Sequence, residues 1–363
     1  MNRVLVGASR QYEVLISREI LQSAGELTSA VHKPCRAAII TDDIVDGLYG
    51  GAVAASFGIS GYEVSRFAFK NGELSKNLSV YENMLDFLSD SGITRTDIAV
   101  ALGGGVTGDL AGFAAASYLR GIDFIQIPTT YLAAVDSSVG GKTGLNLKTG
   151  KNLCGAFHQP LMTLIDCGTF KTLPAERFAD GMAETIKYGV ISDAALFETA
   201  EAGISGACSD ECPNICIEEI VSRCIKIKAR FVREDEFDNG ARQMLNFGHT
   251  FGHAIERCSG YSVSHGAAVG IGMLMAAKAA LKLGFCGEDC VRRIAAILKK
   301  YGLPLESEYG ADELAAAMQG DKKRRGNTIS LILPEKIGCC RICDIPVSDI
   351  KRLILHANEE KLL

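Results

Sequence analysis

Residues 97–119, DIAVALGGGVTGDLAGFAAASYL, decide the fold of this 363-residue chain. The apolar run IAVAL predicts a buried strand, and a helix rich in small residues follows the glycines. Gly103, Gly105 and Gly108 fit the pattern G-x-G-x-x-G, in which backbone N–H groups can approach a pyrophosphate at a helix N-terminus. At least two strands come earlier, whereas the usual dinucleotide loop follows the first strand. A tight turn with close helix packing therefore explains these glycines equally well.

The surrounding segments alternate between strand and helix patterns. Strands are expected at residues 37–43, 62–69 and 122–130, and a helix at 78–92. Such alternation indicates a parallel sheet with helices on both faces. The strand ends bring Asp42, Asp109, Thr129 and Thr130 toward one edge, where open parallel sheets bind ligands.

After about residue 166 the pattern becomes mainly helical. Helices are expected at 174–191, 217–236 and 265–284, and a short strand pair at 328–346. The length also favours two domains. The expected fold is an α/β, Rossmann-like nucleotide-binding domain over residues 1–170, followed by a mainly α-helical, metal-binding domain over residues 171–363.

Composition excludes several classes of protein. With 47% apolar residues, 22% charged residues and a net charge of −5, the chain is globular and has no general basic surface for nucleic acid. The N-terminus lacks a signal-peptide pattern, and the longest apolar stretch, residues 267–277, is too short to span a membrane. Thirteen cysteines without an export signal indicate reduced thiols and a cytoplasmic location.

Two groups of cysteines are candidate metal ligands, and one lysine-containing loop is a candidate phosphate-binding loop. The groups, Cys208, Cys212, Cys216 and Cys339, Cys340, Cys343, lack a second CxxC pair, so buried free thiols are the favoured interpretation. The stretch Gly141-Lys142-Thr143 is no P-loop, because Asp136 occupies the position of the first glycine.

Histidines gather in NFGHTFGH and in the SHG that follows it. His249 and His253 are four residues apart and would share a helix face, His265 comes shortly afterwards, and Glu184 offers a carboxylate from another helix. Three protein ligands are typical of a catalytic zinc. Spacing alone leaves the triplet open, and histidines that merely make hydrogen bonds remain an alternative.

Cationic and amide side chains surround these histidines. Lys187 follows Glu184 by one turn, Lys228 lies in KIKAR, and Arg242 and Asn246 precede His249 at near-helical spacing. A solvated helix face is the ordinary explanation. The neighbouring Gly and Phe residues favour a pocket for a carboxylate and a phosphate, to which Arg and Lys donate charge-assisted hydrogen bonds.

Taken together, several motifs resemble those of a known family, the 3-dehydroquinate synthases within the sugar-phosphate cyclases. They are GGGVTGDLAGFAAASYLRG, IPTTYLAAVDSSVGGKTGLN, GKNLCGAFHQP, LPAERFADGMAETIKYG, NFGHTFGHAIE and HGAAVGIGM, in the order of the family. The resemblance runs from Asp42 to the DKK at residues 321–323, which is most of the chain.

The resemblance implies roles for residues that the spacing leaves open. NAD would be bound by Asp42, Glu73, Lys76, Gly104, Gly105, Val106, Asp109, Thr129, Thr130, Lys151, Thr169 and Thr172. One zinc or cobalt ion would be held by Glu184, His249 and His265. Substrate would meet Arg120, Asp136, Lys142, Asn152, Lys187, Lys228, Arg242, Asn246, His249, His265 and Lys322 or Lys323. Catalytic roles would fall to Lys142, Lys187, Asp238, Arg242, Asn246 and His253.

The activity implied is that of the shikimate route of aromatic amino-acid biosynthesis. A small anionic sugar phosphate, 3-deoxy-D-arabino-heptulosonate 7-phosphate, would be transiently oxidised by NAD, lose phosphate by β-elimination, be reduced again and close by an aldol step, which makes the enzyme a phosphate-eliminating carbon–oxygen lyase. The resemblance also implies a homodimer, with Arg120 reaching phosphate across its interface. Two departures stand out: Asp238 where Glu is frequent, and Ala267 where HGEAV is common.

Three other functions compete with this one. A sister cyclase would act on a different sugar phosphate. An NAD- and metal-dependent polyol or glycerol-phosphate dehydrogenase would share the two-domain plan but produce net NADH. A noncatalytic NAD-sensing protein would need neither the metal ligands nor the lysines.

Overall fold

The computed structural model describes residues 1–204, 216–319, 324–325 and 327–359. By contacts, the chain divides into a first unit of Met1–Leu173 with Gly206–Phe237 and a second unit of Pro174–Ser205 with Asp238–Leu363. The expected boundary at residue 170 lies close to the first of these breaks. By the same contacts, α8 (Ile217–Glu234) groups with the first unit, although it follows residue 170 in the sequence.

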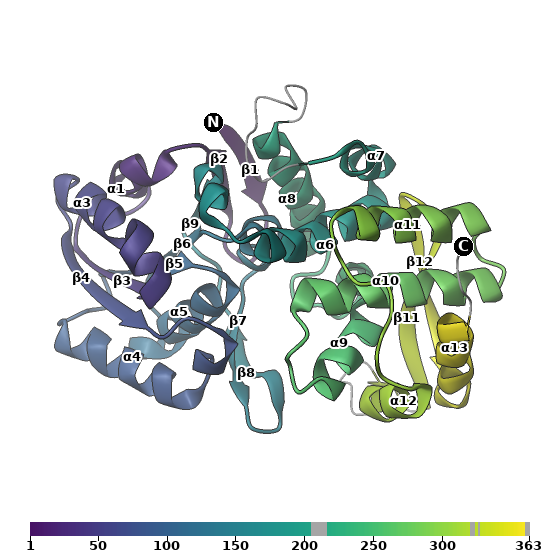
Figure 1. Cartoon of the computed structure of the whole chain (residues 1–363). Helices are drawn as coiled ribbons and strands as arrows, with labels where there is room; N and C mark the ends of the chain where they lie inside the picture. The colour runs from purple at the N-terminus through teal and green to yellow at the C-terminus, as the bar shows by residue number, and fades with distance from the viewer. Residues whose placement is uncertain (205–215, 320–323, 326, 360–363) are drawn as a thin grey trace. The chain divides into compact units, whose positions relative to one another are not determined.

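A seven-stranded sheet forms the centre of the first unit, in the order β1-β2-β9-β6-β5-β3-β4 (Figure 1). The strands from β2 onward are parallel, and β1 adds an antiparallel edge. Their bounds are β1 Asn2–Val6, β2 Tyr12–Ser17, β3 Arg36–Asp42, β4 Glu63–Phe69, β5 Ile98–Gly103, β6 Asp123–Pro128 and β9 Met162–Asp166. A separate antiparallel hairpin pairs β7 (Lys142–Leu147) with β8 (Gly150–Phe157).

Helices cover both faces of this sheet. Alternate residues of β3 point to opposite sides, so Ile39 packs with α1 and α3, and Ile40 packs with α4 and α5. Helix α8 packs against β1 and β2, which is why residues 206–237 belong to this unit. The helical segments are η1 Ile20–Ser23, α1 Ala24–Ser29, α2 Asp43–Val45, η2 Asp46–Gly50, α3 Gly51–Ile59, η3 Glu73–Ser75, α4 Leu78–Asp90, α5 Gly105–Ser117, η4 Tyr118–Arg120, η5 Ala133–Ser137, η6 Cys167–Thr172 and α8 Ile217–Glu234.

The order of the strands reverses between β3 and β5. The chain runs from β3 outward to β4 and then returns to β5 on the other side of β3. The segments that follow these strands at their carboxyl ends therefore flank a topological switch point, where doubly wound sheets bind ligands.

The second unit is mainly helical, as expected, with a small antiparallel sheet at its side (Figure 1). Helix α10 contacts α6, α9, α11 and α13 and is the central element. The elements are α6 Ala175–Ser192, α7 Ala194–Ala202, η7 Ala241–Asn246, α9 His249–Cys258, α10 His265–Lys282, α11 Glu288–Lys300, α12 Ala311–Gln319, β10 Arg324–Arg325, β11 Thr328–Lys336, β12 Cys339–Pro346 and α13 Val347–Glu359. No helix in the described part of the chain combines the length and apolar character needed to cross a membrane.

Candidate active site

Three side chains of the second unit converge in a way that could hold a metal ion. Glu184 lies on α6, while His249 and His265 are the first residues of α9 and α10. One ligand atom from each lies within 4.8 Å of the other two. Glu184 Oε1 is 3.5 Å from His249 Nε2 and 3.4 Å from His265 Nε2. Two imidazole nitrogens and one carboxylate oxygen are a common ligand set for a catalytic zinc.

Glycines and one polar contact bring these helices together. A Cβ on Gly272 of α10 would lie 2.0 Å from the carbonyl oxygen of Gly248, directly before α9. A Cβ on Gly266 would lie 2.3 Å from Cα of Asp180 on α6. Ser264 also donates a hydrogen bond of 2.5 Å to Asp180. The start of α10 is therefore fixed against both helices that supply the other two ligands.

A hydrogen bond orients the ring of His249, and a contact with a carboxylate orients that of His265. His249 Nδ1 lies 3.1 Å from the carbonyl oxygen of Phe247, which can only accept, so the hydrogen is on Nδ1 and Nε2 keeps its lone pair toward Glu184. His265 Nδ1 faces Glu256 Oε1 at 3.7 Å. Carboxylate or carbonyl partners of this kind fix the tautomer of metal-binding histidines.

The carboxylates around His265 favour a positive charge at this position. Burial alone would lower the pKa of His265, but Glu184 and Glu256 outweigh it and raise that pKa to about 10. Lys187 Nζ forms an ion pair with Glu184 Oε2, and both side chains are almost completely buried. A divalent transition-metal cation fits this donor set and satisfies the same demand as the proton.

His253 lies beside the group without belonging to it. Its ring centroid is 5.5 Å from that of His249 and 6.4 Å from that of His265, and its side chain is exposed. The four-residue spacing does place His249 and His253 on one side of α9. The near-helical spacing of Arg242 and Asn246 with His249 spans two elements, because η7 ends at Asn246 and Gly248 adopts a left-handed φ of 78° before α9 begins.

In the first unit, the glycine loop has the geometry of an anion site. The N-cap of α5 is Gly104, which has no side chain to accept from the first-turn N–H groups, so these can bind a phosphate. A Cβ on Gly104 would lie 3.0 Å from Thr130, and one on Gly105 would lie 3.0 Å from Ser137. Val106 belongs to the same first turn.

The other proposed NAD residues follow strands at the same edge. Asp42 Oδ1 accepts from the N–H groups of Ile44 and Val45 and thereby caps α2. Thr129 donates its N–H to the Gly103 carbonyl. After β9, Thr169 and Thr172 lie in η6, and Thr172 Oγ1 is 2.6 Å from the Tyr49 hydroxyl.

Lys76 connects two other predicted residues, Asp109 and Asn152. Its Nζ, which is almost fully buried, donates to Asp109 Oδ2 and to Asn152 Oδ1, each at 2.5 Å. Burial raises the pKa of Asp109, and the charge of Lys76 opposes that rise. Elsewhere in this unit, Lys228 Nζ lies 2.9 Å from Asp136 Oδ1.

The remaining predicted residues have varied surroundings. Arg242 is buried at 2% exposure, Lys142 and Arg120 are exposed, and Asp238 has a left-handed φ of 61°. Lys322 and Lys323 lie outside the described residues, as do Cys208 and Cys212. The described cysteines are free thiols, and among described residues none joins a potential metal group.

Two residues were missed by the sequence reasoning. Glu256 faces His265, and Asn146 bonds to a predicted NAD residue, Glu73. The spacing of Glu256 held a signal, since it follows His249 by two helical turns and so shares its face. For Asn146 the signal depended on strand pairing, which its sequence position does not reveal.

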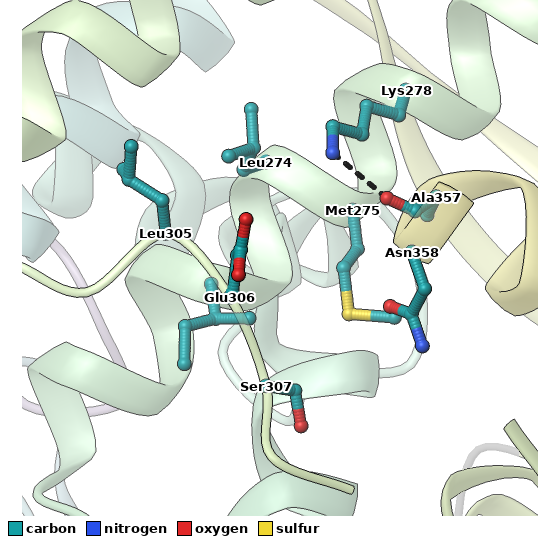
Figure 2. A pocket seen from close by; sticks show the side chains of 9 residues that line it. Leu274, Met275, Lys278, Leu305, Glu306, Ser307, Ala357 and Asn358 are labelled. Atoms are coloured by element: carbon teal, nitrogen blue, oxygen red, sulfur yellow. Dashed lines mark hydrogen bonds between the residues drawn. The ribbon is translucent and has the colours of Figure 1, made fainter. Parts of the chain in front are cut away.

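A small pocket of the second unit is lined by none of these residues. It has a volume of about 110 Å³ and is lined by segments of α10 and α13 and by residues 305–307 (Figure 2). Lys278 is buried here and donates a hydrogen bond of 2.8 Å to the Ala357 carbonyl. Its amino group thus donates to a carbonyl oxygen in the last turn of α13, where carbonyl groups have no N–H partner within the helix.

Comparison with known families matches most of the chain. The 3-dehydroquinate synthase N-terminal model matches residues 66–180, and the C-terminal model matches residues 181–324. A 3-dehydroquinate synthase of Streptococcus suis is 44% identical over 341 residues, covering 93% of this chain and 95% of that protein. One of Pelobacter propionicus is 44% identical over 344 residues, covering 94% and 95%.

Solved structures share the architecture. A 2-deoxy-scyllo-inosose synthase in complex with carbaglucose-6-phosphate, NAD⁺ and Co²⁺ has a TM-score of 0.86 at 28% identity, covering 97% of this chain and 99% of that one. A 2-epi-5-epi-valiolone synthase of Streptomyces hygroscopicus with NAD⁺ and Zn²⁺ has a TM-score of 0.87 at 27% identity, covering 99% of both. The architecture is that of the sugar-phosphate cyclases. Within this class, the chain belongs to the 3-dehydroquinate synthase family.

Proposed function

We propose that this chain converts 3-deoxy-D-arabino-heptulosonate 7-phosphate to 3-dehydroquinate and inorganic phosphate, as a carbon–oxygen lyase of the shikimate pathway. The observation that carries the proposal is the group Glu184, His249 and His265, with His253 beside it, in a chain 44% identical to 3-dehydroquinate synthases over more than nine-tenths of its length. The reaction divides the substrate's atoms between a carbocycle and phosphate, with no water consumed and no net oxidation.

The second unit supplies the metal ligands and the groups around them. Glu184, His249 and His265 hold one zinc or cobalt ion, and the exposed His253 moves protons on the substrate. Lys187 and Arg242, both buried, provide fixed positive charge, and Asn246 provides an amide. Asp238 takes the position of the family's frequent Glu with a shorter reach.

The first unit binds the nucleotide. The N-terminus of α5 holds the pyrophosphate, and the carboxyl edge of the sheet positions the rest of NAD through the remaining predicted residues. When bound, NAD⁺ accepts and returns a hydride, and the metal ion polarises hydroxyl and carbonyl oxygens.

Further groups contact the sugar phosphate from the first unit. The residues that bind it directly are Asp136, Lys142, Asn152 and Lys228. Arg120 binds the phosphate across a homodimer interface. Lys322 or Lys323 adds a cation. We also propose a cytoplasmic location, and neither nucleic acid nor membrane as a partner.

Two kinds of protein with the same fold suggest alternative functions. The sister cyclases named above share the architecture at 27–28% identity. A probable glycerol dehydrogenase of Sinorhizobium meliloti, with a TM-score of 0.64 and 15% identity, shares the fold alone. Sequence identity of 41–44% to 3-dehydroquinate synthases favours the proposed substrate over both.

The deciding experiment measures phosphate release from the heptulosonate phosphate by purified protein with NAD⁺ and Zn²⁺, before and after chelation, while NADH absorbance is followed. Metal-dependent phosphate release without net NADH is the expected result. Absence of phosphate release with metal present would favour a sister cyclase, and steady NADH formation on a polyol phosphate would favour a dehydrogenase.

A further inference from the structure

The β7–β8 hairpin has an irregularity at residues that the proposed function uses. Leu145 pairs with Cys154, but Leu147 pairs with Gly150, so Asn146 alone stands opposite three residues of β8. Those three residues include Lys151 and Asn152. Such bulges interrupt the regular ladder and redirect side chains, often beside active sites.

Asn146 connects this bulge to the segment that follows β4. Its Oδ1 accepts the N–H of Asn152 at 2.9 Å, and its Nδ2 donates to Glu73 Oε1 at 2.7 Å. Its own backbone N–H donates to the carbonyl oxygen of Lys76 at 2.9 Å. One residue therefore joins two segments about seventy positions apart in the sequence.

These contacts close a ring of hydrogen bonds. Asn146 holds the backbone of Asn152, Asn152 Oδ1 accepts from Lys76 Nζ at 2.5 Å, and the Lys76 carbonyl accepts from Asn146. Lys76 Nζ also donates a hydrogen bond to Asp109, which lies on α5, the helix that begins at the glycine loop. Asn152 has a φ of 54°, a left-handed conformation that is uncommon without such support.

We propose that Asn146 is a positioning residue, which sets Glu73 and Lys76 for NAD and Asn152 for substrate without touching either ligand. Its amide suits both tasks, because one oxygen accepts from Asn152 while one nitrogen donates to Glu73. An aspartate would keep the acceptor but place a second carboxylate against Glu73. The inference rests on the proposed function for the roles of these three neighbours.

The test compares Asn146→Ala and Asn146→Asp in the full-length protein, with Thr149→Ala in the same exposed hairpin turn as the matched control. Calorimetric titration gives the NAD⁺ dissociation constant without turnover, steady-state kinetics give KM and kcat for the heptulosonate phosphate, and Tm reports folding. We expect Asn146→Ala to weaken NAD⁺ binding and raise KM, each about tenfold, the effect of losing roughly one net hydrogen bond.

The aspartate variant separates positioning from a general loss of structure. It should retain a KM within about twofold of wild type while losing at least as much NAD⁺ affinity as the alanine variant, because only the contact to Glu73 is broken. If both variants change the two constants together, in step with Tm, or if neither constant changes, the positioning role is overturned. A loss of NAD⁺ affinity in a protein that releases no phosphate would overturn the proposed function and leave the Glu73 contact standing.

Discussion

The ring of His265 is held from two sides, and one of the two partners is not itself a candidate ligand. Nε2 faces Glu184, while Nδ1 faces Glu256, which is 3% exposed on α9. Residue types made Glu184, His249, His253 and His265 candidate ligands, and the family resemblance selected three of them. The partner that orients a ligand could not be nominated in the same way, because a buried Glu in a helix has many possible structural roles and only geometry selects one.

Replacing Glu256 with Gln should weaken metal binding while leaving the three ligands in place. The neutral amide no longer stabilises the Nδ1–H of His265, and losses of such outer partners typically cost about 10- to 100-fold in metal affinity. Competition between the apoprotein and a coloured chelator for Zn²⁺ or Co²⁺ measures the change. Glu308→Gln, at an exposed position, is the control; equal affinities in both variants would remove Glu256 from the site.

The pKa of His265 predicts a pH dependence for the metal-free protein. Because the folded pKa of about 10 exceeds the usual value of roughly 6.5, the protonated ring stabilises the fold fully below pH ~6.5, and this contribution disappears as the pH rises toward 10. Urea unfolding of the apoprotein should therefore show a falling free energy of unfolding across this window. In His265→Asn the pH slope should be smaller, and an unchanged slope would contradict the assignment.

At the scale of elements, the sequence pattern located the helices α4, α5, α6, α8 and α10 but not the shorter helices between them. Helices α6, α8 and α10 lie within two residues of the expected segments at both ends. The interruption before α9 is not visible in the spacing, because Arg242, Asn246, His249 and His253 recur at near-helical intervals across Phe247 and Gly248. A glycine is compatible with either a helix or a left-handed turn, and here close packing against α10 favours the turn.

That close packing makes Gly272 sensitive to substitution. In Gly272→Ala the new Cβ would lie 2.0 Å from a backbone carbonyl of Gly248, so α9 and α10 must separate. We expect a loss of about 1–3 kcal/mol in unfolding free energy, measured with urea, together with weaker metal binding. Gly58→Ala, where a Cβ meets nothing within 4 Å on the helix α3, should instead be neutral or slightly stabilising.

For the whole molecule, the sequence pattern suggested one division near residue 170, whereas the contacts group α8 with the first unit. Helix α8 is strongly amphipathic, and nothing in its own residues says which apolar surface it covers. In the structure Arg18 pairs with Glu218, and Lys228 pairs with Asp136, which fixes α8 to the first unit. Such pairings join residues about a hundred or more positions apart and were not accessible from local patterns.

A fragment of residues 1–173 should consequently be unable to complete its fold. Helix α8 packs on β1 and β2, and its buried residues include Ile220, Val221 and Ile225. Without α8, the surface of β1 and β2 that it covers is open to water. We expect this fragment to bind a hydrophobic dye and to lose cooperative unfolding, and a peptide spanning residues 206–237 to reverse both effects. A fragment that unfolds cooperatively on its own would show that α8 is dispensable.

Because the chain passes repeatedly between its two units, recombination between homologous genes is constrained. The chain passes between its units at residues 173/174, 205/206 and 237/238, so neither unit is one continuous piece of gene. A single crossover between two homologous genes, even at the seam between the two family models at residues 180/181, cuts inside α6 only a few residues before Glu184. Functional hybrids of this family should therefore need matched exchanges at three junctions, and their ancestry should show whole genes inherited together rather than traded halves.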